Sequence, residues 1–270
     1  MVLSVHGPVP WTAKYKSGME TFVRNSTYRL FDKRAFERVD HLIAVSRWIK
    51  INLLKLGLPE DRVSVVYNPV DTSLFSPEKK TKGNKKILIN LDLEQSSYYI
   101  SVGSLVPRKR LVDLISAFSS YEGDKKLVIV GDGPELGRIR QLISKYDLGD
   151  RIKLFRHVDS KSLPYLFAGA QAFVTCSSAE GFPVAVAEAM SSGLGIISPN
   201  TPWMRELADL DNGFLFEPTN IKTIIDAFDF FDKDDSARRC GLRSRKIAEE
   251  KFNVSTFTTK ILRIYRSVLA

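Results

Sequence analysis

The sequence predicts an α/β protein whose larger part is a doubly wound parallel sheet. Short runs of apolar and β-branched residues, bounded by turn residues, recur along the chain, and helical patterns separate them. Continuous apolar runs of this kind suit strands that are buried on both faces of a parallel sheet. A strand, a helix and a second strand at this spacing form right-handed βαβ crossovers, which build a doubly wound sheet.

The elements of this larger part follow in order along the chain. Strands are expected at residues 99–105, 126–133, 151–158, 172–177 and 194–199. Helices are expected at residues 111–121, 135–147, 162–170 and 183–193. The first 75 residues repeat the pattern more weakly, with strands expected in residues 1–7, 41–46 and 63–69 and a helix at 46–57.

A boundary is expected after the weaker pattern. Residues 76–86, "SPEKKTKGNKK", are polar and rich in lysine and contain proline and glycine, which is typical of a linker or an exposed loop. The predicted organisation is a partial N-terminal domain at residues 1–78, a complete domain at 79–254 and a final helix at 255–270. On that helix, helical periodicity places four apolar side chains on one face: Phe257, Ile261, Tyr265 and Val268.

Composition narrows the class of protein. The chain has 270 residues, is 44% hydrophobic and carries a formal charge of +9, so we expect an acidic partner. Anionic lipids and phosphorylated small molecules both qualify. Nucleic acid is not expected, because the basic residues are scattered through every helix and no nucleic-acid motif is present. No apolar stretch approaches the roughly 20 residues of a transmembrane helix, and the N-terminus does not resemble a signal peptide.

Cysteine and histidine usage points away from disulfide and metal chemistry. Cys176 and Cys240 cannot form a disulfide framework, and Cys176 lies in an apolar run that suits a small core residue. His6, His41 and His157 show no metal-ligand spacing, and no paired aspartates that would hold a divalent ion are visible. A reducing, cytoplasmic compartment is expected.

The segment "VGSLVPRKR" follows the first strand of the larger domain. Ligands of open parallel sheets bind outside the carboxyl ends of the strands, where Gly103, Ser104, Arg108 and Lys109 fall. Glycine lets the backbone approach a ligand, and a lysine neutralises a phosphate. A solvated basic loop is the alternative. The nearby "GDGPE" at residues 131–135 resembles a phosphate-binding turn but fits no complete pattern, so a structural helix start is favoured.

The stretch "SSAEGFPVAVAEAM", residues 177–190, carries two acids beside a sharp turn. Gly181 permits the turn, and Pro183 suits the first helical turn because its missing N–H is not needed there. The free N–H groups of that helix attract phosphate or sugar hydroxyls. A carboxylate only accepts hydrogen bonds, so Glu180 or Glu188 facing a cleft suits a vicinal diol such as that of ribose. The alternative is that Glu188 is a surface residue and Glu180 a partner of the helix dipole.

The order of several motifs resembles a known family. "HG", "AVS", "YNPVD", "VGSLVPRK", "VGDGPE", "EGFPVAVAEAM" and "NGFLFEP" occur in this order over nearly the whole chain. Together they resemble the GT4 family of retaining glycosyltransferases, and the E-x7-E motif is its most specific part. The resemblance implies an α/β fold of GT-B type, with a complete Rossmann-like C-terminal domain and a partial N-terminal Rossmann-like domain.

The resemblance also implies roles for particular residues. Glu188 would hold the nucleotide ribose, and Lys109 the diphosphate. Glu180, Gly181, Phe182 and Pro183 would hold the donor sugar and its phosphates, with Gly103, Ser104 and Arg108 completing the donor site. His6 matches the family's histidine close to the transferred sugar, so His6 and Glu180 are the catalytic candidates.

The chain departs from the family pattern in two ways. Ser104 stands where the family usually has an arginine that pairs with the later lysine on the diphosphate, and Arg108 or Arg110 would have to compensate. Family members also carry roughly another hundred residues before "VLSVHG". We therefore expect a chain that lacks the first part of the N-terminal domain, and a chain that binds a nucleotide sugar, self-associates and transfers sugar poorly.

The implied reaction transfers a hexosyl group from a nucleotide diphosphate sugar, UDP- or GDP-linked, to a glycan or lipid-linked acceptor, without a cofactor or an obligatory metal. Cell-surface polysaccharide, lipopolysaccharide or glycolipid synthesis is the expected setting. Residues 11–38 interleave aromatic and basic residues, which favours a peripheral contact with an anionic membrane, although a helix that faces its own domain is the alternative. A non-catalytic fragment or partner subunit that binds a nucleotide sugar remains the alternative function.

Overall fold

The computed structural model describes residues 1–6, 34–79, 82–218, 220 and 222–269. The contacts of the chain divide it into two units. The smaller unit consists of Met1–Pro69, Ala179–Pro183 and Val254–Ala270, and the larger unit consists of Val70–Ser178 and Val184–Asn253. Each unit is described by itself.

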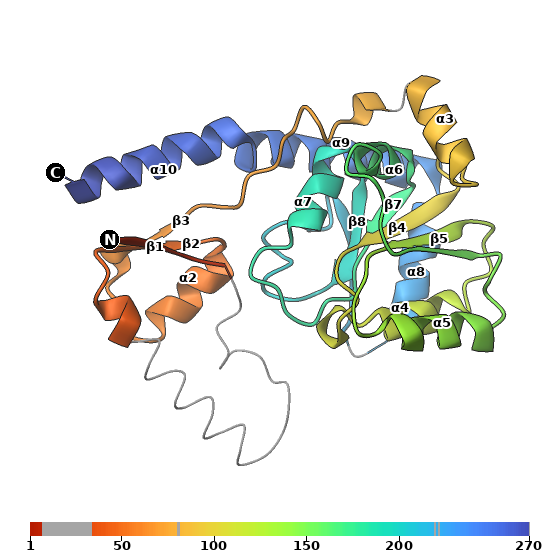
Figure 1. The fold of residues 1–270 in the computed structure, drawn as a ribbon, viewed down its shortest axis with the longest axis horizontal. Coiled ribbons are helices and arrows are strands. Elements are labelled where there is room, and N and C mark those ends of the chain that lie inside the picture. Colours follow the sequence, from red (N-terminus) through yellow and green to blue (C-terminus); the bar gives the residue numbers. More distant parts are fainter. Residues whose placement is uncertain (7–33, 80–81, 219, 221, 270) are drawn as a thin grey trace, which may run out of the picture. The chain divides into compact units, whose positions relative to one another are not determined.

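The larger unit is built on a six-stranded parallel sheet (Figure 1). The strands lie in the order β6-β5-β4-β7-β8-β9. Their bounds are β4 Tyr98–Val102, β5 Lys126–Val130, β6 Ile152–Phe155, β7 Ala172–Val174, β8 Gly195–Pro199 and β9 Gly213–Phe216. All five predicted strands of this part are therefore confirmed, and β9 is an additional strand at the sheet edge.

Helices cover both faces of this sheet. Their bounds are α3 Lys82–Asn90, α4 Leu111–Phe118, α5 Leu136–Lys145, α6 Leu163–Gly169, α7 Val184–Ser191, α8 Lys222–Phe231 and α9 Asp234–Lys251. Figure 1 shows α4 and α5 on one side of the sheet and α6 and α7 on the other. The core on the α4 side includes Phe118 of α4, Ile139 of α5 and Phe228 of α8. The predicted doubly wound arrangement is confirmed.

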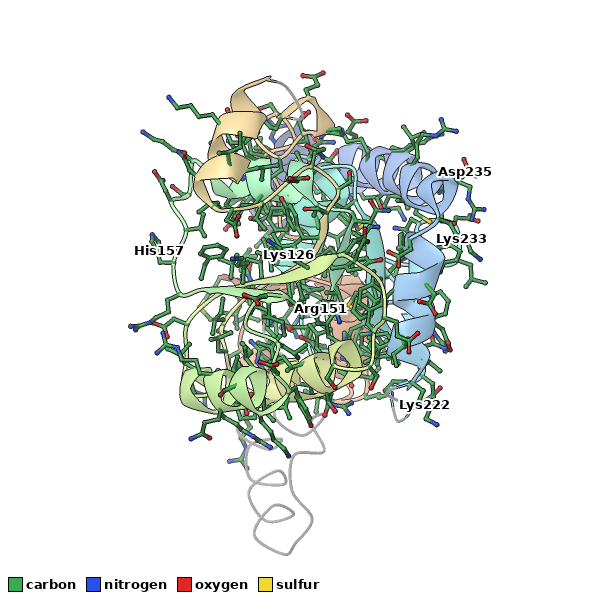
Figure 2. The ribbon with its side chains drawn as sticks, turned by 90° about the vertical axis from the view of Figure 1, so that its right-hand side faces the viewer. Lys126, Arg151, His157, Lys222, Lys233 and Asp235 are labelled. Atoms are coloured by element: carbon green, nitrogen blue, oxygen red, sulfur yellow. The ribbon has the colours of Figure 1, made fainter. Side chains whose placement is uncertain are left out.

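An arginine closes the edge of this core. The guanidinium of Arg151 donates hydrogen bonds to the carbonyl oxygens of Tyr121 at 2.8 Å and Gly123 at 2.7 Å. It also stacks over the rings of Phe118 and Tyr121, at 5.0 and 5.4 Å from their centroids. Figure 2 shows Arg151 within the body of the protein, whereas His157 extends from its edge. Arg151 is thus held by stacking on two aromatic rings and by two backbone carbonyls, and it does not form part of a basic surface.

The predicted linker at residues 76–86 is wrong. The structure has a 3-10 turn, Pro77–Lys79, and then helix α3, whose Leu88 is only 2% exposed. Helices α3 and α6 pack closely, since a Cβ added at Gly169 of α6 would lie only 2.9 Å from Cδ1 of Leu88. This packing anchors the segment. Lysine favours helices, and Gly83 obscures the helical pattern in the sequence.

The division between the units falls between Pro69 and Val70, earlier than the expected boundary at residue 78. Residues 70–78 belong to the larger unit because they bond to it. The hydroxyl of Ser191 donates to the carbonyl of Phe75 at 2.6 Å, and the guanidinium of Arg245 donates to the carbonyls of Thr72 and Phe75. Val70 also pairs with Asn253 in an isolated bridge.

The smaller unit contains a three-stranded parallel sheet in the order β1-β2-β3. Its elements are β1 Val2–Val5, β2 His41–Ala44, helix α2 Arg47–Leu54 and β3 Val63–Val65. The side chain of Ser46 caps α2 by accepting a hydrogen bond from the N–H of Ile49 at 3.1 Å. The three predicted strands and the helix between the last two are confirmed.

Helix α10, Val254–Leu269, packs against this sheet within the smaller unit. Ile264 is buried and, with Phe257 and Ile261, meets Ile43 and Val66 of the sheet region. Of the four apolar side chains predicted to share one face, Phe257 and Ile261 pack on the sheet, whereas Tyr265 is 45% exposed. At about 100° per residue, Tyr265 lies at the margin of the face that Phe257, Ile261 and Ile264 share.

Among the helices in the described part of the chain, none has both the length and the apolar character needed to cross a bilayer.

Candidate functional site

The strand order of the larger unit singles out the carboxyl ends of β4 and β7. Strands β4 and β7 lie side by side, while the strands that follow them in sequence lie on opposite sides, β5 beyond β4 and β8 beyond β7. Ligands of open α/β sheets bind at such a switch point, outside the carboxyl ends of the strands. The loops after β4 and β7 meet there, because the N–H and hydroxyl of Ser178 both donate to the carbonyl of Arg108, at 2.8 and 3.1 Å.

The loop after β4 brings a cation over an exposed piece of backbone. Gly103 has φ +153°, and a Cβ built on it would lie 3.4 Å from both Cε and Nζ of Lys109. The Lys109 ammonium therefore folds back over Gly103. Both residues, together with Ser104 and Thr175, line a cavity at the ends of β4, β5 and β7. A backbone without a side chain next to an ammonium suits an oxyanion such as phosphate.

The glycines of "GDGPE" shape this loop. A Cβ on Gly131 would lie 1.9 Å from the carbonyl oxygen of Gly103, and one on Gly133 would lie 2.5 Å from that of Leu105. The two loops are also hydrogen-bonded, from the N–H of Leu105 to the carbonyl of Asp132 at 2.8 Å. The segment therefore has a structural role, because its backbone packs against the backbone of the Gly103 loop. Helix α5 begins directly after it.

The arginines next to Lys109 differ in their contacts. Arg110 Nε donates to the carboxylate of Asp113 at 2.5 Å, and its Nη1 donates to the carbonyl of Pro218 at 3.0 Å. Arg110 also adopts a left-handed backbone, φ 51°, at the start of α4. The Arg110 guanidinium is thus committed to holding the loop, so compensation for Ser104 by Arg110 is not favoured.

Glu188 is the most unusual acid of the larger unit. It lies in the second turn of α7, between the buried residues Ala187 and Ala189, and is itself partly buried. Its carboxylate forms no hydrogen bond or ion pair with any residue that the structure describes. Burial raises the pKa of Glu188 to about 7. A partly buried carboxylate without a protein partner is poised to accept hydrogen bonds from a ligand.

The predicted residues just before α7 belong to the smaller unit. Glu180, Gly181, Phe182 and Pro183 are all buried, and the ring of Phe182 lies 5.7 Å from that of Tyr67. Pro183 directly precedes α7, as expected for a proline at a helix start. The alternative that Glu188 is a surface residue does not fit its partial burial, whereas a role of Glu180 as a partner of the helix dipole is compatible with its exposure of 7%.

The remaining sequence candidates are placed as follows. His6 directly follows β1, and its side chain is exposed. Cys176 is buried in the core, as predicted, and burial raises the pKa of its thiol far above its usual range. His41 lies on β2, and its Nε2 is 2.9 Å from the hydroxyl of Ser64. Within the described part of the chain, no group of three or more His, Cys, Asp or Glu side chains is arranged to hold a metal ion.

One ion pair at the carboxyl ends of β5 and β6 was not predicted from the sequence. Arg156, just after β6, donates to the carboxylate of Asp132, just after β5, at 2.6 Å. This pair holds the pKa of Asp132 below its usual value. The two residues are 24 positions apart, so no local motif signals the contact; the parallel pairing of β5 and β6 creates it.

Comparisons with solved structures define the class of protein. The chain superposes on HepE from Anabaena, solved with UDP and glucose, with a TM-score of 0.83 at 20% identity over 98% of this chain and 71% of HepE. It superposes on sucrose-phosphate synthase from Thermosynechococcus elongatus with a TM-score of 0.85 at 21% identity, over 99% of this chain and 67% of that enzyme. The chain has the GT-B glycosyltransferase fold.

Family models then identify the family. Residues 85–247 match the model "Glycosyl transferases group 1", and residues 1–74 match "Glycosyltransferase Family 4". The first match alone covers more than half of the chain, so the protein belongs to the group 1 glycosyl transferases.

Curated relatives agree with this assignment. The N-acetyl-alpha-D-glucosaminyl L-malate synthase of Bacillus anthracis is 27% identical over 86% of this chain and 61% of its own length. The O-antigen chain mannosyltransferase RfbU of Salmonella typhimurium is 26% identical over 73% of this chain and 52% of its own length. The chain thus spans about half to three fifths of these relatives.

Proposed function

We propose that the protein is a retaining glycosyltransferase that moves a hexosyl group from a nucleotide diphosphate sugar to a glycan or lipid-linked acceptor. The observation that carries the proposal is the partly buried, unpartnered carboxylate of Glu188 on α7, in the same unit as the Lys109 ammonium over Gly103. A carboxylate suits the vicinal diol of ribose, and an ammonium over bare backbone suits a diphosphate. A nucleoside diphosphate carries both groups.

Each predicted residue keeps a role in this proposal. Lys109, Gly103 and Ser104 bind the diphosphate, and Arg108 supports them from the turn that Ser178 holds. Glu188 binds the ribose. The donor sugar is assigned to Glu180, Gly181, Phe182 and Pro183, and the catalytic roles to His6 and Glu180, on the strength of the family's motif pattern.

The chemistry asked of these residues is mainly electrostatic. The demanding event is departure of the nucleoside diphosphate, during which negative charge builds on the leaving phosphate. The Lys109 ammonium and the N–H groups at the start of α7 are positive groups of the kind that stabilise such charge. The proposal involves no cofactor and no obligatory metal ion.

The donor is proposed to be UDP-linked, with a GDP-linked donor as the alternative. Several structural neighbours were solved with UDP or UDP-glucose, including HepE in three structures. The acceptor is proposed to belong to cell-surface polysaccharide or glycolipid synthesis. Relatives named as O-antigen mannosyltransferases and as a phosphatidylinositol N-acetylglucosaminyltransferase subunit support this setting.

A cytoplasmic location with a peripheral membrane contact is part of the proposal, because a lipid-linked acceptor is presented at a membrane surface. The basic, aromatic segment at residues 11–38, for which this contact was predicted, lies almost wholly outside the described residues.

The proposal is tested by thermal shift with UDP-glucose, GDP-mannose and ADP-glucose, followed by a transfer assay that reports the anomeric configuration of the product. A ligand at 100 times its dissociation constant stabilises by about 2.7 kcal/mol, which is easily measured. Stabilisation by none of the three would contradict the proposal. Binding without transfer would favour the alternative function, a non-catalytic nucleotide-sugar-binding subunit.

A further inference from the structure

Helix α10 carries a second apolar surface besides the one that packs on its sheet. Twelve large apolar side chains are exposed among the described residues, and four of them belong to this one helix. They are Val254 at 51%, Leu262 at 48%, Tyr265 at 45% and Leu269 at 86% exposure. We call these four the outer stripe. Side chains of this size scattered singly need no explanation, but a concentration on one helix does.

Three members of the outer stripe form one continuous side of α10, and Val254 lies about two turns before them. Leu262, Tyr265 and Leu269 are spaced by three and four residues, which places them along one side of a helix. At about 100° per residue this side lies roughly 90° from the packed face formed by Phe257, Ile261 and Ile264. Tyr265 borders the packed face, whereas Leu262 and Leu269 lie further round the helix, and each of these three side chains is at least 45% exposed.

The charge of α10 is one-sided. Residues 254–269 include Lys260, Arg263 and Arg266 and no acidic residue, and all three basic side chains are exposed. Helical geometry puts Arg266 next to the outer stripe and Lys260 and Arg263 on the opposite, polar side. A helix with leucines on one side and basic residues on the other has the composition of helices that lie in the plane of an anionic lipid surface.

The length of α10 fits that orientation. Sixteen residues rise about 24 Å at 1.5 Å per residue, less than the roughly 30 Å of hydrocarbon that a spanning helix needs. Tyr265 adds an aromatic ring with a polar tip, which suits the boundary between headgroups and acyl chains.

We propose that α10 is the membrane-docking surface of this protein: the outer stripe inserts at the headgroup boundary of an anionic bilayer while Arg266, next to the stripe, contacts lipid phosphates and the bases of the polar side add long-range attraction to the anionic surface. A lipid surface fits better than a protein partner because the helix offers only positive charge and a narrow stripe without a groove. This inference deepens the membrane contact proposed above by naming its surface, and it does not depend on the assignment of the nucleotide site.

The test is co-sedimentation of the full chain with vesicles of phosphatidylcholine alone or mixed with phosphatidylglycerol. The stripe variant combines Leu262→Gln, Tyr265→Gln and Leu269→Gln, and the charge variant combines Arg263→Gln and Arg266→Gln. A matched control in α9 combines Leu242→Gln, Arg239→Gln and Arg243→Gln, since Leu242 is 64% exposed and lies between two exposed arginines. All substituted side chains are exposed, so folding is expected to be retained.

The expected result is binding of the wild type to the mixed vesicles that weakens with added salt, at least about a tenfold loss in both α10 variants, and no loss in the control. Binding by the α10 variants equal to that of the wild type would overturn the assignment of α10 while keeping a membrane contact elsewhere. Absence of wild-type binding would overturn the membrane contact itself. A wild-type oligomer that becomes monomeric in the stripe variant would identify a second copy as the occupant instead.

Nucleotide binding by the same proteins separates this inference from the proposed function. The variants are expected to bind UDP as the wild type does, because α10 belongs to the smaller unit and Lys109 and Glu188 to the larger. Failure of every protein to bind nucleotide would contradict the proposed function and leave the vesicle result standing.

Discussion

Replacing Glu188 by glutamine should stabilise the unliganded protein and weaken nucleotide binding. The structural reason for the first effect is burial, which raises the pKa of Glu188 from 4.5 to about 7 without any partner that compensates. A shift of about 2.5 pKa units corresponds to about 3 kcal/mol between the protonated and ionised forms. In the folded protein the ionised carboxylate is therefore a destabilising group.

The pH dependence of this effect has a definite sign. The folded state binds the Glu188 proton more tightly than the unfolded state, so the native protein loses stability as pH rises between about 4.5 and 7. Below this window both states are protonated and no penalty exists; above it the penalty is complete. Glu188→Gln should thus raise the free energy of unfolding by up to about 3 kcal/mol at pH 8 and by much less near pH 4.5.

The second effect has the opposite direction. If the Glu188 carboxylate accepts hydrogen bonds from the ribose diol, glutamine loses a charged hydrogen bond worth roughly 1.5–3 kcal/mol, so affinity for UDP should fall at least about tenfold. Urea unfolding at several pH values and isothermal titration with UDP measure the two effects. Glu250→Gln is the matched control, because Glu250 is exposed on α9.

Either of two results would refute this reasoning. A Glu188→Gln protein that is less stable than the wild type at pH 8 would show that the carboxylate has a structural partner. Unchanged affinity for UDP would show that Glu188 does not contact the nucleotide. A residue that costs stability and is needed for binding is the pattern expected of a functional group.

Three further predictions test the site. UDP affinity of the wild type should increase as pH rises through about 7, because the bound form needs the ionised Glu188. Proton release on binding is measured by calorimetric titration in buffers of different ionisation enthalpy. An affinity that does not change with pH would contradict the raised pKa of Glu188. Lys109→Ala should weaken binding of UDP but not of uridine, and equal losses for both would indicate a distorted loop. Gly131→Ala should destabilise by roughly 1–3 kcal/mol and weaken UDP binding, because its Cβ would lie 1.9 Å from the Gly103 carbonyl, whereas Gly137→Ala, with open space around it, should not.

The sheet of the larger unit could be predicted because each of its strands has a recognisable local sequence pattern. Its strands are apolar runs between turn residues, and the crossover rules then fix a parallel, doubly wound arrangement. The missed helix α3 shows the limit, since its pattern is interrupted by Gly83 and its anchor, Leu88, is recognisable only once α6 is in place. On α10 the periodicity gave Phe257 and Ile261 but not Ile264, because Ile264 and Tyr265 are neighbouring apolar residues and only the sheet decides which of them is buried.

The candidate site was predictable in position but not in chemical state. Gly103 and Lys109 follow a strand, and Glu188 lies on a helix that follows another, so the general rule for parallel sheets locates them. The contact of Ser178 with Arg108 joins residues 70 positions apart, which no local pattern reveals. The elevated pKa of Glu188 depends on what surrounds it and on the lack of a partner, and both are tertiary properties.

These chemical states bear on which ligand the larger unit selects. An isolated ammonium over backbone would accept any small anion, and an isolated carboxylate would repel all of them. Here the cation follows β4 and the acid lies on the helix that follows β7, its neighbour in the sheet. In the proposed site a free phosphate contacts Lys109 but offers no hydroxyl donor to the partly buried Glu188 carboxylate, whereas a nucleoside diphosphate offers a group to each of them. The unfavourable free energy of the ionised, partly buried Glu188 carboxylate is offset only by a ligand that carries hydroxyl donors as well as negative charge. Discrimination against phosphate and pyrophosphate therefore follows from the same unpartnered acid that makes the empty protein less stable.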